Sequence, residues 1–214
     1  MKKSNQDIKD KIIEDCLEDV VFDGWNENTL KNSFKKNNVN IDMFYGFFPN
    51  GVEDVILHFI NYSDRKMLET YNKIKVKPKN IPEKIKTLLL IRFTQHNSHK
   101  EAIRRASRML ILNQNIFLSS KSLYSTVDLI WRTCEDKSTD FSFYSKRFSL
   151  SMLYISVFIS WLNDYENNLK DTEDFINRRL HDVAFFGKYS SSIKSGLNNV
   201  FNNFQNFDFN KSRY

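Results

Sequence analysis

The chain has 214 residues, a length that suits one sizeable domain, alone or with a small attached module. Apolar residues make up 41% of the sequence, which is enough for a core, while five glycines and three prolines are too few for a turn-rich all-strand fold. The net charge of +6 is uneven, because residues 61–108 hold thirteen Lys or Arg against four Asp or Glu. A basic belt of this kind suits nucleic acid, anionic lipid or an acidic protein, or is simply a solvated lysine-rich surface.

Two features bear on the compartment. The only cysteines, Cys16 and Cys134, each fall within an apolar helical stripe, so we expect buried thiols in a reducing compartment. No apolar run reaches the roughly 18 residues that a bilayer-spanning helix needs. The first sixteen residues carry acids and no apolar run, so we expect neither a secretion signal nor a transit peptide there.

The first third of the chain shows helical periodicity. Residues 8–21 predict an amphipathic helix that ends near Gly24. A short helix with Asn28 or Thr29 as its cap follows, then a turn at residues 37–38 and a second short helix over residues 41–48. Two short helices around a tight turn have the shape of a helix-turn-helix. A long amphipathic helix is predicted next, over residues 52–71.

A basic, proline-containing stretch at residues 72–84 is the expected boundary in the chain. We therefore divide the sequence into a helix-turn-helix-like part (1–72), a helical domain (73–187) and a tail (190–209). Helices are predicted at 83–95, at 99–112 and at 122–134, the last capped by Ser122. No strand pattern is present, so the expected fold class is all-α.

Residues 140–165 are apolar on nearly all sides, which predicts a helix that is buried or meets something apolar. Another capped helix is predicted from Asp171. In the tail, apolar side chains fall on one side of a predicted helix, opposite Ser and Asn. They are Ile193, Leu197, Val200, Phe201 and Phe204. We expect this helix to dock on a membrane by apolar insertion, or on a partner, with packing onto its own domain as the alternative.

Catalytic motifs are absent from the sequence. The four histidines have no acid or thiol at ligand spacing, and there is no phosphate-binding loop and no nucleophile motif. Asp136 and Asp140 could act as paired acids, but they precede a long apolar helix, where acids and hydroxyls act as caps. We favour capping, with Ser138 or Thr139 as the cap residue, and expect no catalytic residue and no metal.

The aromatic residues that follow have a different character. Phe143, Tyr144 and Arg147 lie about one helical turn apart, so they are expected to share a face. Tyr144, Lys146 and Arg147 would give that face a hydrated rim. The stretch is thus interpreted as an apolar docking face supported by polar groups.

Residues 127–183 resemble a family of ubiquinone-biosynthesis accessory proteins whose eukaryotic member is the ninth coenzyme Q protein. The family pattern runs aliphatic–Trp, Gly-Asp-x-Ser-x-Asp, aromatic-Tyr-Thr-x-Arg, an apolar stretch, Asp-Thr and Phe-x-x-Arg-Arg. The matching residues are Trp131, Asp136, Ser138, Asp140, Phe143, Tyr144, Arg147, Asp171, Thr172, Phe175, Arg178 and Arg179. Departures are Glu135 where Gly is usual, Phe143 where Trp is usual, and Ser145 for Thr.

The resemblance implies a TetR-like fold, with an N-terminal helix-turn-helix, a helical lipid-binding domain and a C-terminal amphipathic helix. It implies a homodimer that is not an enzyme and that binds isoprenoid lipid or a quinone intermediate. It further implies support of the di-iron demethoxyquinone hydroxylase. A bacterial member would lie on the inner face of the cytoplasmic membrane, and eukaryotic relatives on the matrix side of the mitochondrial membrane.

Carried over residue by residue, the resemblance names Phe143 and Tyr144, with Asp136, Asp140 and Arg147 as supporting polar groups. The apolar helix that follows is expected to line the lipid cavity. The full predicted set is a lipid-binding or partner face with supporting polar groups. The face consists of Trp131, Phe143, Tyr144, Arg147, Leu153 and Phe158. The supporting groups are Asp136, Ser138 and Asp140. No cofactor is expected beyond the bound lipid or quinone intermediate.

Two other functions stay open. A TetR-type DNA-binding regulator with an apolar ligand would fit the fold, but residues 40–48 contain no Lys or Arg to reach phosphates or bases. Specific nucleic-acid binding is therefore not expected. An enzyme that uses Asp136 and Asp140 is the second alternative.

Overall fold

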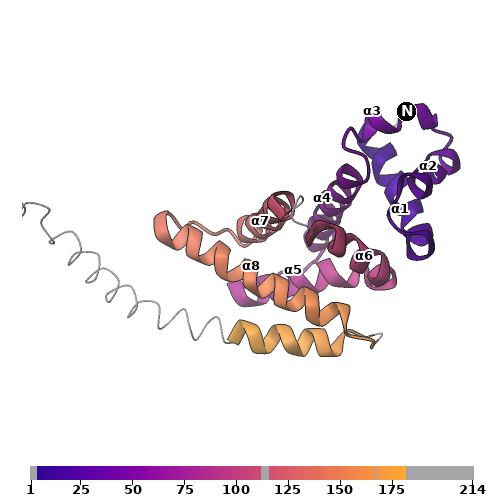
Figure 1. Cartoon of the computed structure of the whole chain (residues 1–214). Coiled ribbons are helices and arrows are strands. Elements are labelled where there is room, and N and C mark those ends of the chain that lie inside the picture. The colour runs from indigo at the N-terminus through magenta and orange to yellow at the C-terminus, as the bar shows by residue number, and fades with distance from the viewer. Residues whose placement is uncertain (1–3, 112–115, 167, 182–214) are drawn as a thin grey trace, which may run out of the picture.

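The computed structural model describes residues 4–111, 116–166 and 168–181, apart from the side chains of residues 140 and 141. Throughout these ranges the regular structure is helical, with no strand (Figure 1). The predicted all-α class is confirmed. Among the helices in these ranges, none combines the length and apolar composition that crossing a bilayer requires.

Helix α1 (Asn5–Asp23) begins in a capping box between Ser4 and Asp7 and ends at Gly24. Gly24 has a φ of 78°, a backbone conformation that glycine adopts without steric cost. Helix α2 (Glu27–Lys36) begins after Asn26, whose side chain accepts a hydrogen bond from the Thr29 amide. The cap expected at residues 28 or 29 is therefore wrong by two or three positions, because an equally good cap residue precedes them.

The second short helix predicted over residues 41–48 is divided in the structure. A 3-10 turn, η1 (Ile41–Met43), leads directly into α3 (Phe44–Phe47). Phe34 of α2 meets Phe44, Phe47 and Phe48 edge-on, with ring centroids 5.6–6.3 Å apart. These four rings are buried, and we call them the aromatic corner.

Helix α4 (Val52–Asn72) leads away from the aromatic corner toward the rest of the molecule (Figure 1). Residues 73–80 then connect it to α5 (Ile81–Thr94), which packs against α4. After η2 (Asn97–His99) come α6 (Lys100–Ile111) and α7 (Ile116–Thr133). Because α7 begins at Ile116, Ser122 lies inside the helix and is not its cap, contrary to the sequence prediction.

Helix α8 (Asp140–Leu162) follows a six-residue loop, and Thr139, one of the two cap residues predicted, occupies the N-cap position. Helix 170–181 doubles back beneath α8 (Figure 1). The turn between the two helices is held by Asp164, whose carboxylate accepts hydrogen bonds from the amide and the hydroxyl of Thr172.

The part of the molecule that follows α4 has its core between α5, α7 and α8. Phe93 of α5 packs against Trp161 of α8, with ring centroids 5.3 Å apart, and Val127 and Ile130 of α7 are fully buried nearby. Both cysteines are buried free thiols, as expected. Burial raises the pKa of Cys16 to about 12.

The core also contains charged and polar groups. The guanidinium of Arg92 lies 3.2 Å from the carboxylate of Asp64, which accepts a second contact from the Thr126 hydroxyl at 2.8 Å. His96 is bonded to the Ser63 hydroxyl at 2.7 Å. Burial lowers the pKa of His96 to about 3, so this imidazole is neutral at physiological pH.

Segment 190–209 lies outside the described residues. The five side chains predicted to dock on a membrane lie there too: Ile193, Leu197, Val200, Phe201 and Phe204. Their docking stays a prediction.

Candidate functional site

The site predicted from the sequence begins at the loop between α7 and α8. The amide of Asp136 donates to the carbonyl of Trp131, and the amide of Glu135 donates to that of Arg132, which closes α7 in a Schellman motif. This motif places Glu135 in the left-handed region, at a φ of 62°. Glycine is the residue that best tolerates this conformation, which fits the glycine that the resemblance implies at this position.

Asp136 anchors the loop to α8. Its side chain is only 3% exposed, and its carboxylate accepts hydrogen bonds from the amide and hydroxyl of Ser138. Lys146 contacts the same carboxylate at 2.7 Å. Burial raises the pKa of Asp136, but the bonds from Lys146 and Ser138 outweigh burial and bring the pKa below its usual value. Asp136 thus orients α8 through ion pairing rather than by capping the helix.

Arg147 occupies the centre of the site. Its side chain is 4% exposed, so its predicted place on a hydrated rim is wrong. The guanidinium bonds Asp128 at 2.7 Å, approaches Asp136 at 3.4 Å, and lies 3.3 Å from the centre of the Phe143 ring. Arg147 turns inward because two buried carboxylates need a positive partner.

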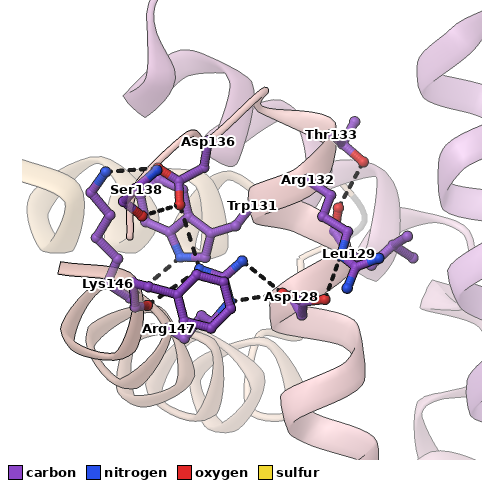
Figure 2. A network of polar contacts seen from close by, with 10 residues as sticks. Asp128, Leu129, Trp131, Arg132, Thr133, Asp136, Ser138, Lys146 and Arg147 are labelled. Carbon is purple, nitrogen blue, oxygen red and sulfur yellow. Dashed lines mark hydrogen bonds and ion pairs between the residues drawn. The ribbon is translucent and has the colours of Figure 1, made fainter. Parts of the chain in front are cut away.

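Together these groups form a continuous chain of ion pairs. Figure 2 shows Asp128 between Arg132 and Arg147, and Asp136 between Arg147 and Lys146. We call this chain the α7–α8 ion-pair network. It joins the last two turns of α7 to the first two turns of α8, and so fixes how α8 leaves the loop.

Asp128 is a member of this network that the sequence analysis did not single out. It stands on α7 beside Val127 and Ile130, so a carboxylate interrupts the apolar side of that helix. Arg147 interrupts the apolar pattern of α8 in the same way. A single acid on one apolar helix face and a single base on another indicate that the two helices pack with these charges in contact. This was the sequence signal that could have identified Asp128.

Trp131 supports the same arrangement from beneath. It is 8% exposed, and its indole nitrogen donates to the Lys146 carbonyl at 3.2 Å. The Lys146 ammonium lies 5.4 Å from the centre of the indole ring. Trp131 is therefore a packing residue under the candidate face and presents little surface to a partner.

The outward side of α8 is a stripe of exposed apolar side chains. Tyr144 is 68% exposed and Phe148 is 70% exposed. Further along the helix the stripe continues, because positions at intervals of three or four residues share one face. The α8 stripe consists of Tyr144, Phe148, Met152, Ile155 and Ile159.

The remaining predicted site residues lie elsewhere on α8. Leu153 is buried in the core, and Phe158 is partly buried, with its ring 6.0 Å from Trp161. Phe143 is half-buried over Arg147, and its ring meets that of Tyr144 edge-on at 5.2 Å. Asp140 begins α8, and its side chain is not described. Of the six residues of the predicted face, only Tyr144 is exposed. Phe143 lies between Tyr144 and Arg147, and the other four are buried or partly buried.

A hollow of about 580 Å³ lies between α1, α4 and α7. Eight of its ten lining residues are polar or charged, among them His58, Asp64 and Arg65 on one side and Asp128 and Arg132 on the other. None of the six residues of the predicted lipid-binding or partner face lines it. This hollow therefore does not have the apolar walls that an isoprenoid chain requires.

The arrangement offers little for catalysis. Asp136 is bound to two cations and a hydroxyl, which holds it ionised and unsuited to proton transfer at neutral pH. Within the described part of the chain, no three His, Cys, Asp or Glu side chains gather where they could hold a metal ion.

The helix-turn-helix-like segment carries few groups for nucleic acid. Residues 37–51 contain no Lys or Arg. Lys31 of α2 is bonded to Glu27 at 2.9 Å and lies over the ring of Phe44 at 5.6 Å. Exposed side chains here include Met43 and Tyr45, which carry no positive charge for phosphate.

Comparison with known proteins bears directly on the α7–α8 region. Residues 116–187 match the sequence model of the COQ9 family. That range contains α7, α8, helix 170–181, the ion-pair network and the α8 stripe.

Curated relatives extend the similarity over most of the chain. The mitochondrial ubiquinone biosynthesis protein COQ9-B of Xenopus laevis is 26% identical over 203 residues, which cover 90% of this chain and 68% of that protein. The chain is thus similar to COQ9 proteins over most of its length. Human COQ9 is 24% identical over 200 residues, and the Dictyostelium discoideum protein, named as probable, is 26% identical over 210. The chain spans 63% of the human protein and 66% of the Dictyostelium protein.

A solved structure confirms the fold. The TetR transcriptional regulator from Nitrosomonas europaea superposes with a TM-score of 0.68 at 16% identity, over 84% of this chain and 99% of that one. The predicted TetR-like fold and the resemblance read from residues 127–183 are both confirmed. At this identity the match concerns the fold and not the function.

Proposed function

We propose that this chain is a non-enzymatic accessory protein of ubiquinone biosynthesis that binds isoprenoid quinone intermediates at a membrane. We further propose that it works as a homodimer and supports the di-iron demethoxyquinone hydroxylase. The relatives support the pathway, because they are named as ubiquinone biosynthesis proteins. The observation that carries the binding role is the α8 stripe, which lies inside the range matched by the COQ9 family model.

The energetics of the α8 stripe favour a partner. A fully buried apolar side chain contributes about 1.5–3 kcal/mol relative to an exposed one. Burying the five side chains of the stripe against a partner would therefore contribute substantially to the free energy of binding. Contiguous exposed apolar surface usually marks an interaction site. Tyr144 adds a hydroxyl at the edge of the stripe, and aromatic residues with a polar tip are common where an interface meets water.

The α7–α8 ion-pair network gives this face a defined geometry. Arg147 is held by two carboxylates and lies against the Phe143 ring, which is in turn packed against Tyr144. A side chain whose neighbours are fixed loses less conformational entropy on binding. We assign the hydroxylase contact to Tyr144 and Phe143. We assign the isoprenoid contact to the rest of the stripe, from Phe148 onward, and to Leu153 and Phe158 behind it.

The lipid part of the proposal is tested by mass spectrometry of the purified protein. Under native conditions it is expected to carry a co-purified isoprenoid quinone or a related lipid, and to bind vesicles. If the protein carries no isoprenoid lipid and binds no vesicle, this function is wrong.

The partner part is tested by Tyr144→Asp, with Tyr165→Asp as a matched control. Both tyrosines are exposed, at 68% and 86%, but Tyr165 lies after α8 and outside the stripe. Tyr144→Asp is expected to weaken hydroxylase binding at least ~10-fold while the free energy of unfolding changes by less than ~0.5 kcal/mol, as for most surface substitutions. Tyr165→Asp is expected to change neither quantity. Equal weakening by both variants would contradict the assignment of the contact to Tyr144.

Asp140→Asn gives a second comparison. Asp140 occupies the first turn of α8, where a negative charge stabilises the helix dipole. The variant is expected to cost about 0.3–1 kcal/mol of stability and to leave hydroxylase binding intact. Loss of binding at unchanged stability would move Asp140 from a structural to a contact role.

A further inference from the structure

The connector between α4 and α5, residues 73–80, is a basic loop that the proposed function leaves unused. Every second residue from Lys73 to Lys79 is a lysine, and all four lysines are exposed. Between the middle two, Val76 is 85% exposed. Over residues 72–86 the sequence holds six lysines and one acid, Glu83, a formal charge of +5.

The four connector lysines form no ion pair with another residue in the described ranges. Two acids of the neighbourhood are already engaged, because Glu69 lies 3.8 Å from Lys66 and Glu135 lies 3.1 Å from Lys84. The positive charge of the connector is therefore not neutralised by the protein itself. Such a concentrated charge attracts an anionic surface over about a Debye length.

The connector is fastened at both ends. At its start, Ile74 packs against the core, and the Lys77 ammonium lies 5.3 Å from the centre of the buried Tyr71 ring. At its end, the Asn80 side chain caps α5 by accepting from the Glu83 amide at 2.9 Å. Four ammonium groups and one aliphatic side chain are thereby presented by a short, tethered segment.

We propose that the connector is a docking surface for an anionic membrane, with the lysines on lipid phosphates and Val76 at the interface. This inference rests on the membrane part of the proposed function and specifies its lipid chemistry. The connector would add positive charge to the predicted membrane helix of the tail, because Lys194 is the only cation in segment 190–208. Amphipathic insertion and electrostatic attraction together give stable binding where either alone is marginal.

A lipid surface fits the connector better than nucleic acid does. The segment contains no arginine for bidentate contacts and no aromatic side chain to stack on a base. It carries instead an exposed valine between lysines, and Ile81 just beyond it is 40% exposed. Closely spaced lysines around one exposed aliphatic side chain suit a charged interface with an apolar interior.

The connector also lies close to the candidate site. The Lys84–Glu135 contact holds the first turn of α5 beside the loop that leads into α8. Contact of the connector with a membrane would therefore bring the start of α8 near the lipid surface from which a quinone intermediate must come.

The test measures vesicle binding by the full chain. Lipid vesicles of phosphatidylcholine alone are compared with vesicles containing about 30% phosphatidylglycerol, at about 50 and 300 mM salt, which spans strong and weak screening. The test variant replaces Lys73, Lys75, Lys77 and Lys79 by Gln. The matched control replaces four other exposed lysines, Lys11, Lys35, Lys121 and Lys170, and so loses the same charge.

Each lysine near an anionic surface contributes on the order of fivefold in affinity, so the connector variant is expected to bind anionic vesicles at least ~50-fold more weakly. The control is expected to lose less than ~5-fold, by its change in net charge alone. Val76→Gln is expected to weaken binding a few-fold on both vesicle types, because it removes an apolar group that enters the interface. Circular dichroism shows whether each variant keeps its fold.

Three results would overturn the inference. The wild type shows no preference for anionic vesicles, or the connector variant binds them as the control does, or the connector variant loses duplex DNA binding with its vesicle binding intact. Binding to neutral vesicles and co-purified isoprenoid lipid report on the proposed function separately. If the protein binds neutral vesicles and carries isoprenoid lipid but does not prefer anionic vesicles, only the inference about the connector fails.

Discussion

The molecule has two stretches rich in aromatic residues, and it treats them in opposite ways. In residues 43–48, the rings of Phe44, Phe47 and Phe48 are buried against Phe34 of α2. In residues 143–148, Tyr144 and Phe148 are each about 70% exposed. Similar composition therefore gives a packed corner in one place and an open face in the other.

The difference lies in what each stretch packs against. The rings of the aromatic corner pack against one another, and Lys9 of α1 and His58 of α4 lie over Phe48, so the four rings are buried. On α8 the inward side packs on α5 and α7, and among the described residues no element covers the outward side. Burial in the corner serves stability, whereas exposure on α8 is available for binding.

The largest expected effect comes from truncating one phenylalanine in each region. Phe44→Ala removes a fully buried ring and is expected to lower the free energy of unfolding by about 3–5 kcal/mol. Phe148→Ala removes a ring that is 70% exposed and is expected to change it by less than ~0.5 kcal/mol. Urea unfolding of both variants measures the two values. Similar losses in the two variants would mean that Phe148 is covered in solution.

The second effect concerns the ion pairs beneath the α8 stripe. Arg147→Met leaves Asp128 and Asp136 without their shared partner and is expected to lower the free energy of unfolding by about 2–3 kcal/mol. This is less than the loss for a fully isolated buried charge, because Arg132 still pairs with Asp128 and Lys146 with Asp136. Arg132→Met is the control, since the Arg132 side chain is 75% exposed and its loss is expected to cost less than ~1 kcal/mol.

Hydroxylase binding by the same two variants sharpens the comparison. If the network orients the face, Arg147→Met is expected to weaken binding several-fold under conditions where the variant is still folded, and Arg132→Met is not. Unchanged binding in a folded Arg147→Met variant would show that Tyr144 is positioned without the network.

The sequence predicted much of this architecture and less of the site. Helical periodicity predicted the helices, because that signal acts within one or two turns of chain, whereas the caps expected at residues 28–29 and at Ser122 were misplaced. The partner of Arg147 was not predictable in this way, since Asp128 is nineteen residues away and meets it only when α7 packs on α8. Exposure of Tyr144 and burial of Arg147 depend on the same packing, which local spacing does not encode.

The buried core around His96 and the α7–α8 ion-pair network also differ in their response to acid. The buried His96 has a pKa of about 3, well below its usual 6.5, so protonation favours the unfolded chain. The free energy of unfolding is expected to fall as the pH drops from about 6.5 toward 3, by at most ~1.4 kcal/mol per pH unit. Asp136 has a lowered pKa, so the stability that it contributes is present above its usual 3.8 and is lost only below that value.

Urea unfolding at pH 7, 6 and 5 separates these contributions. In this window Asp136 stays ionised. Most of the slope is expected from His96, and a further part from His58, whose pKa is also lowered by burial. His96→Gln is expected to flatten the pH dependence, and His181→Gln, at an exposed position, is expected to leave it unchanged. An unaltered slope in His96→Gln would mean that another group titrates on unfolding.

The smallest expected effect tests how the open face is supported from its loop. Glu135 adopts a φ of 62°, and relief of this left-handed strain by Glu135→Gly is expected to stabilise the fold by about 1 kcal/mol. Against this, the unfolded chain gains freedom and the exposed pair with Lys84 is lost, each costing roughly 0.5 kcal/mol or less. The net change is therefore expected to lie between about 0 and +1 kcal/mol.

Glu135→Gln separates the two causes, because it removes the charge of the side chain and keeps its β-carbon. It is expected to be slightly less stable than the wild type, and Glu135→Gly is expected to be more stable than Glu135→Gln. The reverse order would show that the turn before α8 depends on the Lys84 contact more than on backbone geometry. In that case the face would be held by ion pairs on both sides of the loop, with Lys84 acting from α5 as Arg147 acts from α8.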